Sequence, residues 1–397
     1  MNTLLINLPE TQQPPTYMPP LGLWKIRKEL LRLGHRVRIC DMHMGDDLED
    51  ALSHRYQHIG ISARFSVQHE NYLRVTARVS GLAFVSAGGI HAMHAGAVPG
   101  VDRICREPGE QYYRRLLTGD ASIDHNDYLP PWFSYREISR YWNRYAPHDL
   151  SSMTDRWMSI ETSRGCMGRC HYCGIGELWG KWKPYSLDYM DKQLVGLKRA
   201  GIRELFIEDD NVSWDKTRFL ALIQLFIRYG FLWSCPNGIQ VKTLLDPDVL
   251  NALVDSGCWR LSLPFETGSE ESARLMGVRW KWIDRETAFE LVVSLKSIGI
   301  ETCGFFIIGY PGETRENVQT TLDYANSLPL NQRNIYIATP YPGTRLHDDC
   351  VREGWISGGY SDLTYKTGVI STPWLSAAEV ERMKREDRER AIARRGK

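Results

Sequence analysis

Short apolar runs alternate with amphipathic segments through the first third of the chain. The runs LLINL, RVRICD, HIGISA, LAFVSAGG and VDRIC have strand length, and residues 21–34 between the first two carry Leu and Ile at helical spacing. This alternation predicts an α/β domain over residues 1–120, a doubly wound parallel sheet of flavodoxin type. In such a sheet, ligands lie beyond the carboxyl ends of the strands. The segments that follow the second and fourth strands are short, so we expect short helices there.

A second series of strand and helix units begins near residue 155 and ends near residue 345. Its strand-like runs are WMSIET, ELFIED, WSCPNGI, WRLSLPF, CGFFIIG and NIYIATP. Six such units predict a partial (β/α)6 barrel of the TIM type, with functional groups at the carboxyl ends of its strands.

Two further segments are set apart by their composition. Residues 121–154 are rich in Pro and aromatic residues and read as a linker, either a strap packed across a junction or a source of substrate contacts through Trp132 or Tyr135. Residues 346–397 form a C-terminal extension, in which Ser376 and Glu379 make a capping-box start before interleaved charges. We expect a solvated, charged helix there.

The overall composition excludes several classes of protein. The 397 residues are 43% hydrophobic and 24% charged, which is typical of globular domains and not of disordered or fibrous chains. A formal net charge of +1 gives little long-range attraction to nucleic acid or anionic lipid. No apolar run reaches the roughly 18 residues of a membrane span, and the first residues have no basic region before their apolar stretch. We therefore expect a cytoplasmic protein that binds neither nucleic acid nor membrane.

Three of the nine cysteines are packed into one short segment, GCMGRCHYC. The other six are scattered singly and read as small buried hydrophobic residues. Thiolates at Cys166, Cys170 and Cys173 could hold three irons of a four-iron four-sulfur cluster and leave the fourth iron open to a substrate or cofactor. The rival is a zinc site, for which His171 is the nearest fourth ligand.

This segment resembles the signature of the radical S-adenosylmethionine (radical SAM) enzymes, three cysteines spaced CxxxCxxC with an aromatic residue before the last. Cys166, Cys170, Tyr172 and Cys173 match it without a gap. The resemblance implies that the open iron chelates the amino and carboxyl groups of S-adenosylmethionine. One electron from the cluster then cleaves the cofactor to a 5′-deoxyadenosyl radical, and a protein such as flavodoxin or ferredoxin supplies that electron.

The resemblance continues at the ends of later strands. IEDDN matches the place where the family has a carboxylate near the ammonium of the cofactor, although such acids can equally cap the next helix. LPFETGS resembles a turn that contacts ribose or the methionine carboxylate, and GFFIIGYPGET resembles the adenine-binding stretch. The residues implied to bind S-adenosylmethionine are Tyr172, Glu208, Asp209, Glu266, Ser269, Ile308 and Gly309.

The first domain resembles the cobalamin-binding domain of one large radical SAM subgroup. The resemblance lies in residues 19–41, in the turn SAGGIHA and in REPGEQYYRRLL. A cobalt-ligating DxHxxG motif is only approximated by DMHMG, one residue short, so we do not expect His43 to bind cobalt. The alternative is a vestigial domain kept for packing. The residues implied to contact cobalamin are Ser62, Arg64, Phe65, Gly88, Gly89 and His91.

Together the two resemblances imply an enzyme similar to the class B radical SAM methylases. It would methylate an unactivated carbon through a 5′-deoxyadenosyl radical and methylcobalamin. The chain shows no obvious extra domain to close the barrel mouth. We therefore favour a peptide or protein residue as the methyl acceptor, for example one in methyl-coenzyme M reductase. The rival acceptor is a small molecule. One alternative is a cobalamin-independent radical SAM enzyme that performs cyclisation, epimerisation or carbon–sulfur bond formation. Another is a non-enzymatic iron–sulfur or zinc protein.

Overall fold

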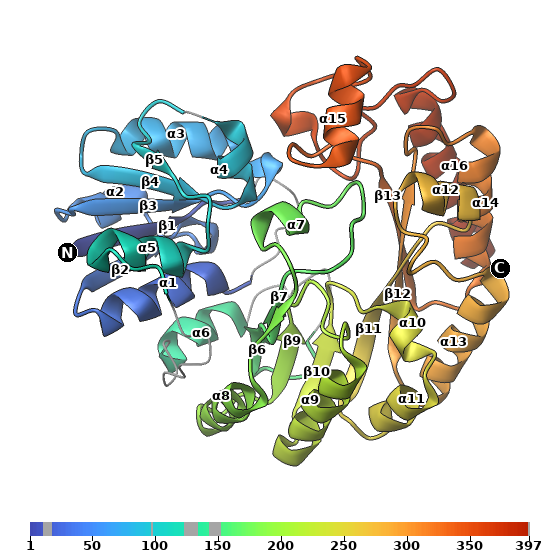
Figure 1. Cartoon of the computed structure of the whole chain (residues 1–397), viewed down its shortest axis with the longest axis horizontal. Coiled ribbons are helices and arrows are strands. Elements are labelled where there is room, and N and C mark those ends of the chain that lie inside the picture. Colours follow the sequence, from blue (N-terminus) through green and yellow to red (C-terminus); the bar gives the residue numbers. More distant parts are fainter. Residues whose placement is uncertain (11–17, 97, 123–133, 143–151, 396–397) are drawn as a thin grey trace. The chain divides into compact units, whose positions relative to one another are not determined.

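The computed structural model describes the chain except for residues 11–17, 97, 123–133, 143–151 and 396–397 (Figure 1). Its contacts divide the chain into two compact units. The first unit comprises Met1–Ile160 and Tyr185–Phe206, and the second comprises Glu161–Pro184 and Ile207–Lys397. Domain boundaries at residues 120, 154 and 345 remain predictions.

A five-stranded parallel sheet forms the centre of the first unit. Its strands lie in the order β2-β1-β3-β4-β5, and every neighbouring pair is parallel. This confirms an α/β architecture with a parallel sheet in the amino-terminal third of the chain. The bounds are β1 (Asn2–Asn7), β2 (Arg36–Asp41), β3 (His58–Ser62), β4 (Phe84–Gly88) and β5 (Arg103–Ile104).

Helices cover both faces of this sheet because neighbouring strand residues point to opposite sides. Leu5 of β1 packs with α1 and α5, whereas its neighbours Leu4 and Ile6 pack with α2, α3 and α4. Short helices follow the second and fourth strands, as expected, and α4 is one of them. The bounds are α1 (Leu21–Arg32), α2 (Leu48–Leu52), α3 (His69–Val79), α4 (Ile90–Ala95) and α5 (Gly109–Thr118).

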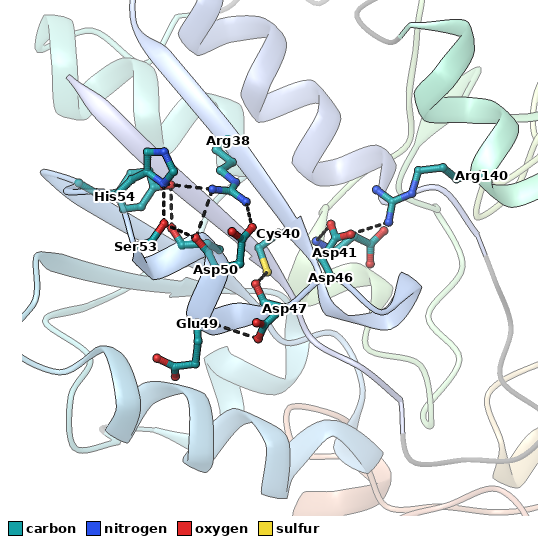
Figure 2. A network of polar contacts seen from close by, with 12 residues as sticks. Arg38, Cys40, Asp41, Asp46, Asp47, Glu49, Asp50, Ser53, His54 and Arg140 are labelled. Carbon is teal, nitrogen blue, oxygen red and sulfur yellow. Dashed lines mark hydrogen bonds and ion pairs between the residues drawn. The ribbon is translucent and has the colours of Figure 1, made fainter.

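The predicted linker contains a helix, α6 (Tyr135–Trp142), that the sequence pattern did not indicate. The Tyr141 hydroxyl donates to Asp41 at the end of β2. Arg140 forms an ion pair with Asp46 at 2.6 Å (Figure 2). The described part of the linker therefore packs against the first unit. Trp132 and the side chain of Tyr135 lie outside the described residues.

The second sheet has six strands in the order β13-β12-β11-β10-β9-β6. Its pairs from β10 to β13 are parallel, and each strand matches one of the six runs that the sequence singled out. The register of β11 against β12 shifts between Pro264 and Glu266, which places a bulge at the end of β11. The bounds are β6 (Trp157–Ile160), β9 (Glu204–Ile207), β10 (Leu232–Cys235), β11 (Cys258–Glu266), β12 (Glu301–Ile308) and β13 (Gln332–Ile337).

Helices follow these strands along the chain. Two of them, α9 and α14, begin at Asp215 and Thr314, whose side chains accept from backbone N–H groups of the first turn. The bounds are α7 (Ile175–Leu178), α8 (Leu187–Arg199), α9 (Lys216–Tyr229), α10 (Val241–Leu244), α11 (Pro247–Leu253), α12 (Glu270–Leu275), α13 (Arg285–Ser297), α14 (Arg315–Ser327), α15 (Arg345–Arg352) and α16 (Ala377–Arg395).

The expectation of a solvated C-terminal helix is wrong for one side of α16. Val380 and Met383 are buried in a cluster with Ile308 of β12. Asp387 is buried too and pairs with Arg333 of β13 at 2.6 Å. The alternating charges hid this buried stripe, because only a few of its positions are apolar. Among the described residues, no helix is long and apolar enough to cross a membrane.

Candidate active site

The cysteine triplet lies on a loop that is closed at its base by two short strands. β7 (Ser163–Arg164) pairs antiparallel with β8 (Lys183–Pro184), and we call the residues between them, 165–182, the cysteine loop. All three thiols are free; Cys166 and Cys170 are partly buried and Cys173 is exposed. The Gly168 N–H donates to Cys166 Sγ at 3.3 Å, a contact that favours a thiolate at this sulfur.

The arrangement of ligand side chains differs from that of a mononuclear zinc site. Within the described part of the chain, no three His, Cys, Asp or Glu side chains are grouped so that they could hold one metal ion. His171, the suggested fourth ligand, has its Nδ1 2.8 Å from the Leu275 carbonyl oxygen and its Nε2 3.2 Å from Arg345. Both ring nitrogens are thus engaged away from the thiols. A four-iron cluster needs only one thiolate per iron, so its ligands do not converge on one point.

The acids after β9 have separate environments. Asp209 is fully buried and accepts from Thr162 and Ser163, which directly precede the cysteine loop. Glu208 instead accepts from the Asn237 amide at 3.0 Å. Burial raises the pKa of Asp209 to about 6, while its hydrogen bonds and Arg218 oppose that rise. The roles predicted for Glu208 and Asp209 in binding S-adenosylmethionine stay predictions.

A buried ion pair lies beside two of the cysteines. Lys281 Nζ is 2.5 Å from Glu266 Oε1, and both side chains are nearly buried. Burial opposes the charge on Lys281, but the negative charges of Glu266, Cys170 and Cys173 outweigh it and raise the pKa of the ammonium. Burial and Glu266 also raise the pKa of Tyr172 well above its ordinary value.

Glu266 is one of only two non-glycine residues with positive φ among those described, at 67°. A strained backbone at a polar strand end is typical of functional sites, because the surroundings must stabilise the strain. Lys281 supplies such a partner here. The sequence reasoning missed Lys281, although a lysine between two tryptophans, in RWKW, is a usable signal for a partly buried cation.

The remaining residues predicted to bind S-adenosylmethionine are built into turns. Ser269 caps α12 by accepting from the Ser272 N–H, and it also accepts from Asn317. The side chain of Ile308 is fully buried in the apolar cluster that includes Val380 and Met383 of α16, so only its backbone could contact a ligand. Gly309 has φ of +77°, and a Cβ there would lie 2.8 Å from Val380 of α16. A larger residue at position 309 would therefore displace the C-terminal helix.

Glu313, in the stretch YPGET, is a second residue that the sequence reasoning missed. Its carboxylate accepts from the Tyr310 N–H at 2.8 Å and so shapes the turn after β12. Burial raises its pKa to about 7. Glu313 therefore supports the turn that carries Gly309, and an acid directly after Pro-Gly is the available sequence signal.

In the first unit, the strand ends after β3 and β4 bring the predicted cobalamin contacts together. The Ala63 N–H donates to the Gly88 carbonyl oxygen at 2.9 Å. Gly89 has φ of +96°, and a Cβ there would lie 2.3 Å from the Ala63 carbonyl oxygen. A glycine at position 89 is thus required by the packing of the two loops. Phe65 is 48% exposed, and the Arg64 guanidinium lies 5.2 Å from its ring centre.

The other candidates in this unit point inward or are partly covered. Ser62 ends β3 and is half-buried. His91 is buried, with its Nε2 3.0 Å from His69 Nδ1, and burial lowers its pKa to about 4. His43 is also buried, and its Nδ1 accepts from the Glu10 N–H at 3.3 Å. Neither imidazole is presented to solvent.

Comparison with known proteins finds a family match in the central part of the chain. Residues 160–325 match the model of the Radical SAM superfamily. A cytidylyl-2-hydroxyethylphosphonate methyltransferase of Streptomyces wedmorensis is 29% identical over 270 residues, 66% of this chain and 50% of that protein. An uncharacterised methyltransferase of Pyrococcus horikoshii is 27% identical over 363 residues, 83% of this chain and 77% of that one. The chain thus spans about half the length of the first of these relatives.

A solved structure matches both units. Radical S-adenosylmethionine methyltransferase TsrM from Kitasatospora setae, with cobalamin and a [4Fe-4S] cluster bound, aligns with a TM-score of 0.71 over 89% of this chain and 78% of its own. At 18% sequence identity, this likeness shows that the two chains share an α/β fold with a TIM-like core. The segment 160–325, which matches the model of the Radical SAM superfamily, contains the cysteine triplet.

Proposed function

We propose that the protein is a cobalamin-dependent radical SAM methyltransferase that methylates an unactivated carbon. The observation that carries this proposal is the cysteine loop, with three free thiols in CxxxCxxC spacing inside the segment that matches the superfamily. When bound, the cluster with S-adenosylmethionine would supply a carbon-centred radical, and cobalamin would supply the methyl group. The residues of the chain would bind these groups, exclude water and hold charge.

The donor set of the cysteine loop suits an iron–sulfur cluster. Cys166, Cys170 and Cys173 would be its ligands, and soft thiolates select such clusters. The Lys281 ammonium beside Cys170 and Cys173 opposes the rise that burial causes in the pKa of the Cys170 thiol. This positive charge would also stabilise an anionic cluster. Glu266 balances the ammonium, so the site holds no uncompensated buried charge.

The first unit suits a large planar ligand at the ends of β3 and β4. We propose that it is a flavodoxin-like, cobalamin-binding-like domain, and two observations support this. The strand order is β2-β1-β3-β4-β5, the order of flavodoxin-like folds. Phe65 is an exposed aromatic ring at a strand end, with the Arg64 guanidinium over it and Glu10 paired to Arg64 at 3.8 Å. Arg64, Phe65, Gly88 and Gly89 would form the contacts.

The class of acceptor is the least constrained part of the proposal. A peptide or protein residue, for example one in methyl-coenzyme M reductase, is the hypothesis from the sequence. Relatives with small-molecule names support the rival: the cytidylyl-2-hydroxyethylphosphonate methyltransferase, and a bacteriochlorophyllide d C-12(1)-methyltransferase of Chlorobaculum tepidum that is 27% identical over 226 residues. TsrM has also been solved with tryptophan substrate and aza-SAM. We expect an electron donor such as flavodoxin or ferredoxin in either case.

The test is anaerobic reconstitution of the full chain with iron, sulfide and hydroxocobalamin, followed by desalting and a visible spectrum. We expect about four irons per chain, bound corrin, and formation of both S-adenosylhomocysteine and 5′-deoxyadenosine. Cluster and 5′-deoxyadenosine without corrin would contradict the cobalamin part and support cyclisation, epimerisation or carbon–sulfur chemistry instead. Metal binding without 5′-deoxyadenosine would contradict the proposal altogether.

A matched pair of variants tests the cobalamin site itself. Phe65→Ala should weaken hydroxocobalamin binding about tenfold because the exposed ring is lost, as for other aromatic contacts. His43→Ala should leave the affinity unchanged, because His43 is buried and engaged by Glu10. Acceptor class is read separately, by asking whether isotope from methyl-labelled S-adenosylmethionine enters the protein or the small-molecule fraction of an extract.

A further inference from the structure

Three consecutive residues after β9 bind three successive points at the start of the cysteine loop. Asp209 contacts Thr162 and Ser163, Asp210 contacts Gly165, and Asn211 contacts Cys166. We call these three residues the loop clamp. Residues 209–211 thus contact residues 162–166 in sequence order. Neither the capping of a helix nor the binding of a ligand requires such an ordered set of contacts.

Asp209 is the most strongly engaged member of the loop clamp. Its Oδ1 accepts from the Thr162 N–H at 2.6 Å, and its Oδ2 accepts from the hydroxyls of Thr162, at 2.6 Å, and Ser163. The side chain is fully buried, so no water competes for these oxygens. Both oxygens of Asp209 are therefore used inside the protein.

Asp210 and Asn211 extend the contacts into the loop itself. Asp210 Oδ2 accepts from the Gly165 N–H at 2.9 Å. The Asn211 amide nitrogen lies 4.0 Å from Cys166 Sγ, the same sulfur that accepts from the Gly168 N–H. Gly165 has φ of +76°, and a Cβ there would lie 2.7 Å from the Lys181 carbonyl oxygen. The start of the loop is thus fixed against both its own far end and the loop clamp.

The far end and the middle of the loop are anchored as well. The Trp182 indole N–H is shared between Ser163 Oγ, at 3.0 Å, and the Asn211 carbonyl oxygen, at 3.1 Å. In the middle, the His171 N–H donates to the Met276 carbonyl oxygen at 2.9 Å. These contacts hold the backbone of the loop, and none of its three cysteines is in a disulfide.

We propose that Asp209, Asp210 and Asn211 are positioning residues that hold the cysteine loop in its ligand-presenting shape before any metal binds. The inference rests on the proposed function only in taking the thiols as cluster ligands. It assigns Asp209 to the scaffold of the loop and away from the ammonium of S-adenosylmethionine. Many metal sites are unfolded until the metal binds, whereas a loop held by these contacts would keep its shape in the apoprotein.

Hydrogen exchange on the full-length apoprotein, prepared anaerobically, tests this directly. The Gly165 amide donates to Asp210, so Asp210→Ala should speed its exchange about tenfold, the effect of losing one buried hydrogen bond. Asp210→Asn keeps an acceptor oxygen and should restore most of the protection. The combination Thr162→Val with Ser163→Ala removes hydroxyl partners of Asp209 without emptying its buried site, and it should speed exchange across residues 163–182.

Glu208→Gln is the matched control, because Glu208 lies on the same segment and accepts from Asn237. It should leave exchange in residues 163–182 unchanged. Equal exchange in the wild type and Asp210→Ala would overturn the proposal, and so would an equal acceleration in Glu208→Gln.

A second readout separates positioning from a merely structural role. Hydrogen bonds to cluster sulfurs raise the reduction potential, so Asn211→Ala should load iron yet show a more negative midpoint potential. An unchanged potential in Asn211→Ala would overturn the part of the inference that concerns Asn211. If the wild-type apoprotein is protected as expected but binds no cluster, the proposed function fails while the loop clamp stands.

Discussion

Two loops near strand ends carry candidate metal ligands and are held by aspartates. The aspartates leave the ligand residues accessible in one loop, whereas the ligand residue is buried in the other. In the cysteine loop, Asp209 and Asp210 bind the backbone and hydroxyls, and the thiols stay free. In residues 41–47, at the end of β2, Asp41 accepts from the Met44 N–H and from Asn7. Asp46 accepts from the Asp41 N–H (Figure 2). Here the candidate ligand, His43, is itself buried.

The difference shows how to recognise a site that is ready to bind. A preorganised site fixes the residues between its ligands and leaves the ligand atoms available. The cysteine loop meets this criterion, and the 41–47 loop does not. Two motifs that look alike in the sequence, an acid run and a ligand residue near a strand end, can therefore differ in function.

The largest expected effect is the loss of iron when one of the three cysteines is replaced. Replacing Cys166, Cys170 or Cys173 singly with Ala should reduce iron and sulfide after anaerobic reconstitution to near background, because each thiolate would hold one iron of the cluster. His43→Ala should keep the full iron content. Iron and sulfide analysis with the visible spectrum checks both, and full iron in any of the three cysteine variants would contradict the ligand assignment.

A smaller effect tests the rigidity of the cysteine loop. Gly165→Ala places a Cβ 2.7 Å from a backbone oxygen at a positive φ, so we expect it to lower the free energy of unfolding by about 3 kcal/mol. Gly180→Ala has φ of +69° but open space around its Cβ, so it should cost about 1 kcal/mol. Urea unfolding of the apoproteins measures both, and equal losses would argue against a tightly packed loop base.

The smallest expected effect compares the response of the two units to acid. Burial lowers the pKa of His58 and His91 in the first unit to about 4, so the folded unit binds fewer protons than the unfolded chain below the ordinary pKa. Its stability should fall as the pH drops from about 7.5 to 5.5, by about 1 kcal/mol for each histidine. In the second unit, burial raises the pKa of Glu313 to about 7, so Glu313 alone should add about 2 kcal/mol of stability over the same range.

Hydrogen exchange at the two pH values, corrected for intrinsic rates, would resolve these opposite trends unit by unit. His58→Gln should remove about half of the acid sensitivity of the first unit. Glu313→Gln should reduce the gain in the second unit and leave the part that Asp209 and Asp210 contribute. Parallel changes in both units would contradict the assignment of these buried groups.

The sequence predicted the repeating parts of the molecule well. The six strands of the second sheet and the five of the first follow from apolar runs, because buried parallel strands read as nearly continuous hydrophobic segments. The helix α6 was missed, since a Pro-rich and aromatic segment gives little periodic signal. The buried side of α16 was missed because its apolar positions are few.

The sequence predicted the candidate cluster ligands but not the residues that position them. A spacing pattern identifies Cys166, Cys170 and Cys173, whereas the partner of an acid such as Asp209 depends on which residues the fold brings opposite it. Lys281 and Glu266 are 15 positions apart and meet only because the segment that contains α12 folds back on itself. Such pairings are tertiary, so no local pattern reveals them.

The contact between α16 and the end of β12 has a consequence for how the protein is made. Val380 and Met383 complete the core around Ile308, and Val380 packs against Gly309. During synthesis from the amino end, this strand end therefore stays uncovered until residues near 383 have left the ribosome. A tag or fusion near α16 would therefore alter the packing of that turn.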